Sequence, residues 1–410
     1  MTKLPVAFIE TTRQLMGDER FCRYMESFEA DVPVSIRLNP KKSLEFRGER
    51  LEVRDGEPVP WCELGYYLPS RPNFTFDPLF HAGCYYVQEA ASMFVHHVLQ
   101  HPGLLPPTSD LRLLDLCAAP GGKSTCAVAA LPPGTELWSN EPVAKRASIL
   151  LENVTKWGYP NCHVTNNYPC DYVRSGLLFD VILCDVPCSG EGMFRRDPLT
   201  IGEWSQQNVE KCWRLQREIV ADAWKCLRSG GILIYSTCTF NTKENEENVR
   251  WMIEHLGAEP LPVELRPEWN ITGSLLPGFE EPVYRFIPGI TRSEGLFMAV
   301  MRKPASADDG RSSKRKDKRD LLKIVHSIEK YEPSTPTVEL AYKTAIGYLR
   351  GEAIVLPSDA PRGVVAVAFQ GHPLGPVKNI GSRANNLYPK EWRIKSTYIP
   401  ETYETIFTTA

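Results

Sequence analysis

Short apolar runs alternate with longer amphipathic segments between residues 111 and 302. The runs are rich in Val, Ile and Leu and predict β-strands over residues 111–117, 135–141, 162–165, 179–185, 231–237 and 295–301. The segments between them predict helices over residues 122–131, 142–157, 208–228 and 242–256. Asn241 and Glu244 have the spacing of a capping box at the start of the last helix. Strands that alternate with helices indicate an α/β fold with a mostly parallel, doubly wound sheet.

Both flanks of this α/β core differ from it in pattern. Residues 1–110 combine a helical start with aromatic-rich segments and predict an N-terminal α+β extension. Residues 303–320 are polar and basic, so we place a linker at 303–329, whose Lys/Arg run is either a solvated tether or an RNA contact. Residues 330–410 regain apolar alternation and predict a small β-rich domain. Within it, residues 362–395 carry six basic side chains and one acidic one, which fits a nucleic-acid surface or an ordinary barrel face equally well.

Composition narrows the class of protein. Of the 410 residues, 42% are hydrophobic and 24% are charged, as in ordinary soluble globular proteins. No apolar run approaches the roughly 18 residues that a membrane span needs, and the start lacks a secretory hydrophobic region. We therefore expect a cytoplasmic protein with no membrane partner, and a monomer by default. The formal net charge of -3 argues against a strong positive field over the whole molecule but leaves local basic patches open.

Twelve cysteines are scattered along the chain. In a reducing cytosol we expect most of them to be small buried hydrophobes rather than disulfide partners. A zinc site would use paired spacings, and Cys184 with Cys188 forms only one pair, so we expect no metal. Cys188 and Cys238 differ from the rest because each one follows a predicted buried strand and precedes a turn.

The first predicted strand is followed by a Gly-Gly turn and a helix, which is a favourable place for a nucleotide-like ligand. The local sequence matches neither G-x-x-x-x-G-K-[ST] nor G-x-G-x-x-G, so a triphosphate or a dinucleotide is disfavoured. Glu141 stands at the tip of the second strand, where a carboxylate accepts hydrogen bonds from ribose hydroxyls. Asp115 either contacts the same ligand or caps the turn. A nucleoside cofactor without a pyrophosphate fits this pattern, and S-adenosylmethionine is the commonest one.

Four motifs in order carry a family resemblance. The segments "DLCAAPGGKST", "NEPVAKRASILLENVTKWG", "CDVPCSGEGMFRRDP" and "YSTCTFNTKENEENV" resemble those of the NOL1/NOP2/Sun family of RNA 5-methylcytosine methyltransferases. The segments "SIRLNP", "GYYL" and "GCYYVQEAASM" resemble the family's N-terminal extension. The tail "VAVAFQGHPLGPVKNIGSRANNLYPKEWR" resembles the PUA-like ending of the bacterial subgroup that methylates small-subunit ribosomal RNA. The resemblance covers most of the chain outside the linker.

This resemblance implies a Rossmann-like class I methyltransferase core over residues 111–302 and a PUA-like RNA-binding domain over 330–410. It implies S-adenosylmethionine as cofactor and 16S ribosomal RNA as the expected partner. The cofactor-binding residues that it implies are Asp115, Cys117, Ala118, Ala119, Pro120, Gly121, Gly122, Lys123, Glu141, Arg146, Asn167 and Asp185. One position departs from the family: many members have an Asp after the third strand, where this chain reads "VTNNYP", so Asn167 is the candidate for the adenine contact.

Two thiols suit cytosine chemistry. Carbon 5 of cytosine is a poor nucleophile until a thiolate adds at carbon 6, and a second group must then help to remove the carbon 5 proton. The resemblance implies that Cys238 attacks and that Cys188 assists release of the methylated base. The residues alone leave the opposite assignment open, because DNA cytosine methyltransferases attack with a Pro-Cys loop. We expect Asp185 to contact the amino group or ring nitrogen of cytosine, and Lys123 to lie near the cofactor carboxylate or to hold Asp185.

The target base has to leave its stack to reach these groups, so we expect single-stranded or locally opened RNA. Arg195 and Arg196 either contact phosphate near the target or belong to a surface turn. Two rival readings keep the RNA partner: the same chemistry on transfer RNA or 23S ribosomal RNA, and a non-catalytic ribosome assembly factor. The intact set of Cys188, Cys238, Asp185 and Lys123 argues against the second.

Overall fold

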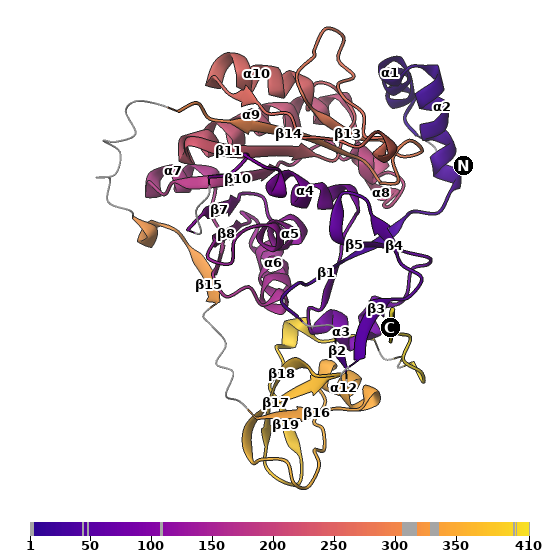
Figure 1. Ribbon diagram of the computed structural model, residues 1–410, viewed down its shortest axis with the longest axis vertical. Coiled ribbons are helices and arrows are strands. Elements are labelled where there is room, and N and C mark those ends of the chain that lie inside the picture. The colour runs from indigo at the N-terminus through magenta and orange to yellow at the C-terminus, as the bar shows by residue number, and fades with distance from the viewer. Residues whose placement is uncertain are drawn as a thin grey trace.

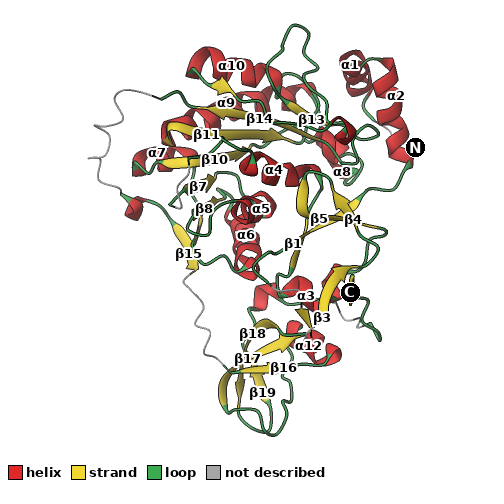
Figure 2. Cartoon of the chain, in the orientation of Figure 1, coloured by secondary structure: helices red, strands yellow, loops and turns green. Residues whose placement is uncertain are grey.

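The computed structural model describes residues 4–42, 45–46, 49–106, 110–305, 318–328, 336–396, 398 and 400–409. In Figure 1 the central α/β sheet occupies the upper half of the molecule, and the C-terminal region lies below it against the N-terminal region. Figure 2 shows helices on both faces of the central sheet.

The N-terminal region is a mixed α and β structure, as expected. Its α-helices are α1 (Val6–Met16), α2 (Asp18–Glu26), α3 (Pro78–His81) and α4 (Phe94–Gln100). Its strands are β1 (Val34–Leu38), β2 (Glu45–Phe46), β3 (Glu49–Val53), β4 (Glu57–Val59), β5 (Cys62–Leu68) and β6 (Tyr85–Val87). Four of these strands form an antiparallel sheet in the order β4-β5-β1-β6, which packs beside the core.

The core contains every strand and helix that the sequence predicts between residues 111 and 302. Its strands are β7 (Arg112–Asp115), β8 (Glu136–Asn140), β9 (Cys162–Thr165), β10 (Phe179–Asp185), β11 (Leu227–Thr237), β12 (Glu259–Pro260), β13 (Tyr284–Phe286) and β14 (Leu296–Arg302). Its α-helices are α5 (Gly122–Ala130), α6 (Ala144–Trp157), α7 (Pro169–Ser175), α8 (Leu199–Glu203), α9 (Gln206–Cys226) and α10 (Glu246–Leu256). Short 3-10 helices lie at Ser27–Glu29, Phe74–Phe76, Ala91–Met93, Glu191–Met193, Pro267–Trp269, Arg319–Leu321 and Lys390–Trp392.

The main sheet has the order β12-β14-β11-β10-β7-β8-β9-β15, in which β15 is Ile324–Ile328, with β13 added to β14. Strands β11, β10, β7, β8 and β9 are parallel, which confirms the doubly wound α/β prediction. Strand β14, however, runs antiparallel to β11, because the chain returns from α10 through β12 and β13 rather than through a crossover helix. The sheet is therefore mostly, not wholly, parallel.

The predicted linker contains a strand that its composition does not reveal. Strand β15 (Ile324–Ile328) pairs antiparallel with β9 and forms one edge of the main sheet. Residues 306–317 and 329 of the predicted linker, with the first part of the basic run, lie outside the described residues, whereas Arg319 is described and pairs with Glu136 at 3.0 Å. Helix α10 begins at Glu246, four residues later than predicted, and the predicted capping contact between Asn241 and Glu244 forms in the turn before it.

Both faces of the central strands are buried, which explains their continuous apolar sequence. Along β10, Val181 and Leu183 join a hydrophobic cluster that includes residues of α4, α5 and α6. Their neighbours Ile182 and Cys184 join a second cluster with residues of α7, α9 and α10. The core is thus a three-layer structure in which successive residues of one strand face opposite layers.

The C-terminal region comprises β16 (Thr337–Glu339), α12 (Tyr342–Leu349), β17 (Gly363–Phe369), β18 (His372–Asn379), β19 (Ala384–Asn386) and β20 (Phe407–Thr409). Its small sheet has the order β16-β17-β18-β19, and β20 pairs with β3 of the N-terminal region. Leu79 and Tyr85 of the N-terminal region share one buried cluster with Ile346 and Phe407. The two ends of the chain therefore pack on a common hydrophobic core.

Candidate active site

The predicted site residues gather at the carboxyl ends of four neighbouring parallel strands. Asp115 ends β7, Asp185 ends β10 and Cys238 follows β11, while Glu141 follows β8. This is the edge at which open parallel sheets bind ligands. Four segments far apart in the sequence thus contribute to one site.

The loop between β7 and α5 has a backbone shape that requires glycine at one position. Gly121 has a φ of 111°, and a Cβ there would lie 3.2 Å from Leu150 Cδ1. Ala118 N donates to Asn140 O at 2.8 Å, and Arg146 Nη2 donates to Ala119 O at 3.0 Å. These bonds fix the loop from Cys117 to Gly122, which includes Pro120, against the neighbouring strand and helix.

Asp115 is fully buried at the floor of this loop. Its Oδ2 accepts a hydrogen bond from Ser124 Oγ at 2.7 Å, while Oδ1 is buried and has no hydrogen-bond partner among the described residues. Burial raises the pKa of Asp115 to about 7. A buried acceptor without a partner costs free energy, so this oxygen is a candidate for binding a ligand donor.

Glu141 and Asn167 flank the loop on the side of β8 and β9. Glu141 is almost fully buried; its Oε1 accepts from Val143 N at 2.9 Å, and its Oε2 lies 3.3 Å from Arg146 Nη1. Asn167 has both side-chain atoms bonded to the backbone of Lys323: Nδ2 donates to the carbonyl at 3.1 Å, and Oδ1 accepts from the N–H at 2.9 Å. The segment before β15 therefore holds the Asn167 amide, and an adenine contact through it stays a prediction.

Cys188 and Cys238 lie side by side. Their Sγ atoms are 3.1 Å apart, and Cys238 N lies 3.4 Å from Cys188 Sγ. Lys123 Nζ pairs with Asp185 Oδ2 at 2.9 Å, and Ser236 Oγ donates to Asp185 Oδ1 at 2.7 Å. The structure thus brings the four predicted catalytic residues together. Of the two roles predicted for Lys123, the structure shows the contact with Asp185.

The charges around the two thiols differ. Burial opposes the charged form of Lys123, but the Asp185 carboxylate outweighs it, with a further contribution from Cys238, and the pKa of Lys123 is raised. The hydrogen bond with Cys238 raises the pKa of Cys188 well above its ordinary value, and burial and the nearby Glu244 carboxylate add to this. The surroundings therefore oppose ionisation of the Cys188 thiol, and Cys238 is the thiol that interacts with the Lys123 ammonium.

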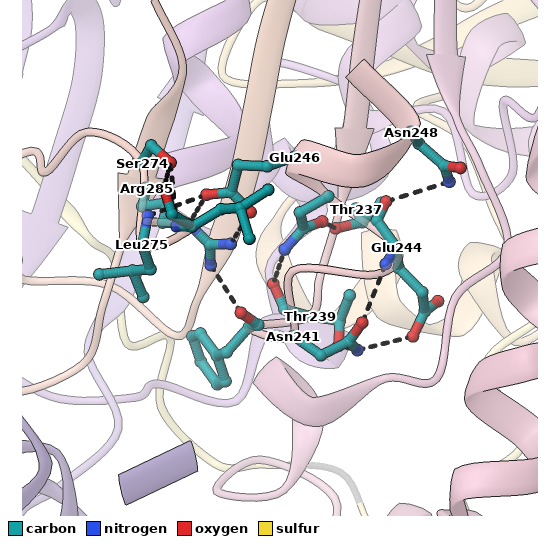
Figure 3. A network of polar contacts seen from close by, with 12 residues as sticks. Thr237, Thr239, Asn241, Glu244, Glu246, Asn248, Ser274, Leu275 and Arg285 are labelled. Atoms are coloured by element: carbon teal, nitrogen blue, oxygen red, sulfur yellow. Dashed lines mark hydrogen bonds and ion pairs between the residues drawn. The ribbon is translucent and has the colours of Figure 1, made fainter. Parts of the chain in front are cut away.

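A buried polar network that the sequence pattern does not predict lies behind the thiols. Figure 3 shows Asn241 and Glu244 in contact, with Thr237 and Thr239 beside them and the Glu246–Arg285 pair a short distance away. These residues resemble solvent-exposed turn residues in the sequence, and only the Asn241–Glu244 spacing signalled a contact. Their burial arises because two loops meet.

Arg195 is not placed for phosphate contact. Its side chain is buried and pairs with Glu294, with Nη1 and Oε1 2.8 Å apart. Burial raises the pKa of Glu294 to about 7 despite this pair. The neighbouring Arg196 is exposed and keeps the predicted phosphate role open.

Among the described residues, no group of three or more His, Cys, Asp and Glu side chains could hold a metal ion. None of the helices in the described ranges is long and apolar enough to cross a membrane.

Three family models match successive parts of the chain. The N-terminal domain of 16S rRNA methyltransferase RsmF matches residues 4–90. The 16S rRNA methyltransferase RsmB/F model matches residues 102–302, and the methyltransferase RsmF PUA domain matches residues 335–394. Their order is the order expected from the resemblance.

Curated relatives agree with these models. Ribosomal RNA small subunit methyltransferase F of Pectobacterium atrosepticum is 33% identical over 316 residues, which cover 74% of this chain and 63% of that protein. The protein of the same name from Erwinia tasmaniensis is 28% identical, with 94% of this chain and 96% of that protein covered. The match thus spans less than two thirds of the first relative and nearly all of the second.

Solved structures share the fold. NSun6 from Pyrococcus horikoshii, determined with SFG, has a TM-score of 0.60 at 22% identity and covers 74% of this chain and 100% of that one. A methyltransferase homolog protein from the same organism has a TM-score of 0.58 at 24% identity, with 73% and 100% covered. At these identities the likeness shows a common methyltransferase fold.

Proposed function

This chain belongs to the RsmB/F family of 16S rRNA methyltransferases, and we propose that it methylates carbon 5 of a cytosine in small-subunit ribosomal RNA. The observation that carries the proposal is the pair of thiols 3.1 Å apart at the ends of β10 and β11. One thiol faces the Lys123 ammonium and the other faces the Glu244 carboxylate. Two adjacent thiols in unlike fields suit a reaction that needs a nucleophile and a proton-transfer group.

The residues at the carboxyl ends of β7 and β8 fit S-adenosylmethionine, which supplies the methyl group when bound. Asp115 Oδ1 is a buried acceptor without a described partner, and a cationic or N–H donor would satisfy it. Glu141 presents a carboxylate where ribose hydroxyls are bound in related folds. The adjoining wall of the proposed cofactor site consists of the loop from Cys117 to Lys123, with Arg146 bonded to it. Asp185, paired with Lys123, lies at the other end of this wall.

Cys238 is the proposed nucleophile. Its thiolate bonds to carbon 6 of cytosine, and the electron pair of the carbon 5–carbon 6 double bond makes carbon 5 reactive. The Lys123 ammonium interacts with Cys238, and the Cys188 sulfur lies 3.1 Å from the Cys238 sulfur. Asp185, oriented by Lys123 and Ser236, accepts a hydrogen bond from the cytosine amino group.

Cys188 is the proposed proton acceptor in the release step. Its pKa is raised first by the hydrogen bond with Cys238, and a bond from Cys238 to carbon 6 removes that influence. Cys188 therefore becomes easier to ionise at the stage when the carbon 5 proton must leave. Cys188 first gives its own proton to water. Its thiolate then takes the carbon 5 proton, the electron pair of the C–H bond reforms the double bond, and the Cys238 thiolate is expelled.

The proposed RNA partner is contacted by the C-terminal region. Residues 362–395 carry a basic excess and lie largely within the part matched by the PUA model. Phosphate contacts of this kind position an RNA without selecting the base. The flipped cytosine then reaches the thiols as a single-stranded nucleotide.

A methyl-transfer assay tests this function. The chain is incubated with S-adenosylmethionine labelled in the methyl group and, separately, with 16S rRNA, 23S rRNA and transfer RNA, and the products are mapped as 5-methylcytosine. We expect label in 16S rRNA only, and none with the Cys238→Ala variant. Label in transfer RNA or 23S rRNA would show that the proposed substrate is wrong. Tight RNA binding without any label would instead support a non-catalytic assembly factor.

A further inference from the structure

The loops that carry the two thiols exchange buried carboxylates. Glu191 lies in the turn after Cys188, yet its Oε2 accepts the backbone N–H groups of Phe240 at 2.7 Å and Asn241 at 2.9 Å, which belong to the turn after Cys238. Glu191 is 2% exposed. The first thiol loop therefore ends in a side chain that caps the second.

Glu244 makes the reciprocal contact. It lies after Cys238, and its Oε2 accepts the backbone N–H of Ser189, the residue that follows Cys188, at 3.0 Å. The same oxygen accepts from Gln216 Nε2 at 2.7 Å, and Gln216 Nε2 also donates to Pro187 O at 2.9 Å. Glu244 is fully buried.

One amide joins the two carboxylates. Asn241 Nδ2 donates to Glu191 Oε1 at 3.0 Å and to Glu244 Oε1 at 2.8 Å (Figure 3 shows the second contact). Trp204 Nε1 is the remaining described partner of Glu191 Oε1, at 3.0 Å. Each of these partners is a hydrogen-bond donor, so the four carboxylate oxygens act only as acceptors.

We propose that Glu191 and Glu244 are positioning residues that fix the separation between the sulfur atoms of Cys188 and Cys238. Each carboxylate is attached to one thiol loop and bonded to the backbone of the other, within two residues of the thiol in both cases. A further backbone bond joins the same two loops, with the donor on the Cys188 side: Gly192 N donates to Cys238 O at 2.8 Å. A buried carboxylate is costly to desolvate, and packing alone would be served as well by apolar residues.

The inference concerns the geometry of the thiols, and it rests on the proposed function only for its effect on methyl transfer. It is tested with Glu191→Gln and Glu244→Gln, which keep the side-chain shape but turn an NH₂ group toward partners that also donate. Glu136→Gln is the matched control: its carboxylate has three charged or ionisable partners, Arg112, Arg319 and His163, at the opposite end of β8. Asn241→Ala is a second test variant that removes the bridge and leaves both carboxylates in place.

The first readout is the rate at which the two thiols form a disulfide with diamide. The diazo bond of diamide takes two electrons and two protons, and the two thiols lose them as the S–S bond forms. The product is measured as the cross-linked peptide that contains Cys188 and Cys238, with Cys188→Ala as the blank. The second readout is S-adenosylmethionine affinity by calorimetry, and the third is kcat for methyl transfer.

We expect the disulfide rate to fall by about tenfold or more in both Gln variants, because loss of alignment slows a proximity-dependent reaction. The disulfide rate of Asn241→Ala should also fall, and that of Glu136→Gln should equal the parent's. The affinity for S-adenosylmethionine should be unchanged in every variant. Removal of the Glu244 charge alone would favour the Cys188 thiolate and speed the reaction, so the sign separates positioning from electrostatics. An unchanged or faster disulfide rate in folded Glu191→Gln and Glu244→Gln proteins would overturn the inference.

Methyl transfer is read separately. If the disulfide rate falls and the parent transfers no methyl group to RNA, the positioning role stands and the proposed function fails. If the parent is active and the Gln variants keep its kcat and its disulfide rate, the function stands and the positioning role fails.

Discussion

Breaking the Glu246–Arg285 ion pair should unfold the core more readily than any surface ion pair in the described residues. Both side chains are almost fully buried, and Arg285 Nε donates to Glu246 Oε1 at 2.8 Å (Figure 3). Arg285 Nη1 also donates to Phe240 O at 2.7 Å, and Leu275 N donates to Glu246 Oε1 at 3.0 Å. One pair therefore anchors two loops to the start of α10.

The magnitude follows from what each substitution leaves behind. Glu246→Leu leaves a buried guanidinium with the carbonyl of Phe240 as its remaining described side-chain hydrogen-bond partner and the Phe297 ring beside it, and such a loss costs about 3–5 kcal/mol. If the α/β core (residues 111–302) unfolds as one cooperative unit, this loss of stability corresponds to a fall in melting temperature on the order of 10 °C. The double variant Glu246→Leu with Arg285→Met leaves no unpaired charge and should be more stable than either single variant.

Urea denaturation of the parent, the two single variants and the double variant gives the coupling energy. Because the double variant should be more stable than either single variant, we expect the coupling energy between Glu246 and Arg285 to reach at least the cost of a single variant, about 3–5 kcal/mol. Single variants that each cost less than about 1 kcal/mol, or a double variant whose cost is the sum of the two, would refute the reasoning.

Two further substitutions probe the loop after β7. Burial raises the pKa of Asp115 from 3.8 to about 7, so the unfolded chain loses this proton at lower pH than the folded chain, and stability declines as pH rises across that window. Near pH 8 the melting temperature of Asp115→Asn should therefore exceed that of the parent by several degrees, and near pH 4 it should be no higher than that of the parent. The same difference in melting temperature at both pH values would contradict this. Gly121→Ala should cost about 1–3 kcal/mol in denaturation, because its φ is 111° and Leu150 is close, whereas Gly202→Ala, with open space around it, should cost little. Equal costs for the two glycines would contradict the backbone argument.

The sequence predicted those elements whose pattern is set by burial on both faces. Strands β9 and β10 occupy the predicted residues 162–165 and 179–185. The start of β11 was misjudged because the polar Arg228–Gly231 stretch interrupts the apolar run, yet it continues the strand directly from α9. Strand β15 was not predicted, because its position depends on pairing with an exposed edge rather than on its own periodicity.

The part of the candidate site that lies at strand ends and in the motifs could be predicted from the sequence. The position of Cys188 and Cys238 after neighbouring strands placed both thiols at one edge of the sheet. The spacing could not reveal the contacts that Glu191 and Glu244 make with the opposite thiol loop, because a carboxylate in a turn is ordinarily solvated and becomes buried only when two loops meet. Likewise, the Asn167 contacts depend on Lys323, which lies 156 residues away in the chain.

The most direct test of the central claim is covalent trapping of RNA in cells. The Cys188→Ala, Cys238→Ala and double variants are expressed, and each is run on a denaturing gel with and without RNase. The account predicts an RNase-sensitive adduct for Cys188→Ala that the double variant lacks, because Cys238 can still bond to carbon 6 while release is impaired. An adduct carried by Cys238→Ala, or by none of the variants, would contradict it.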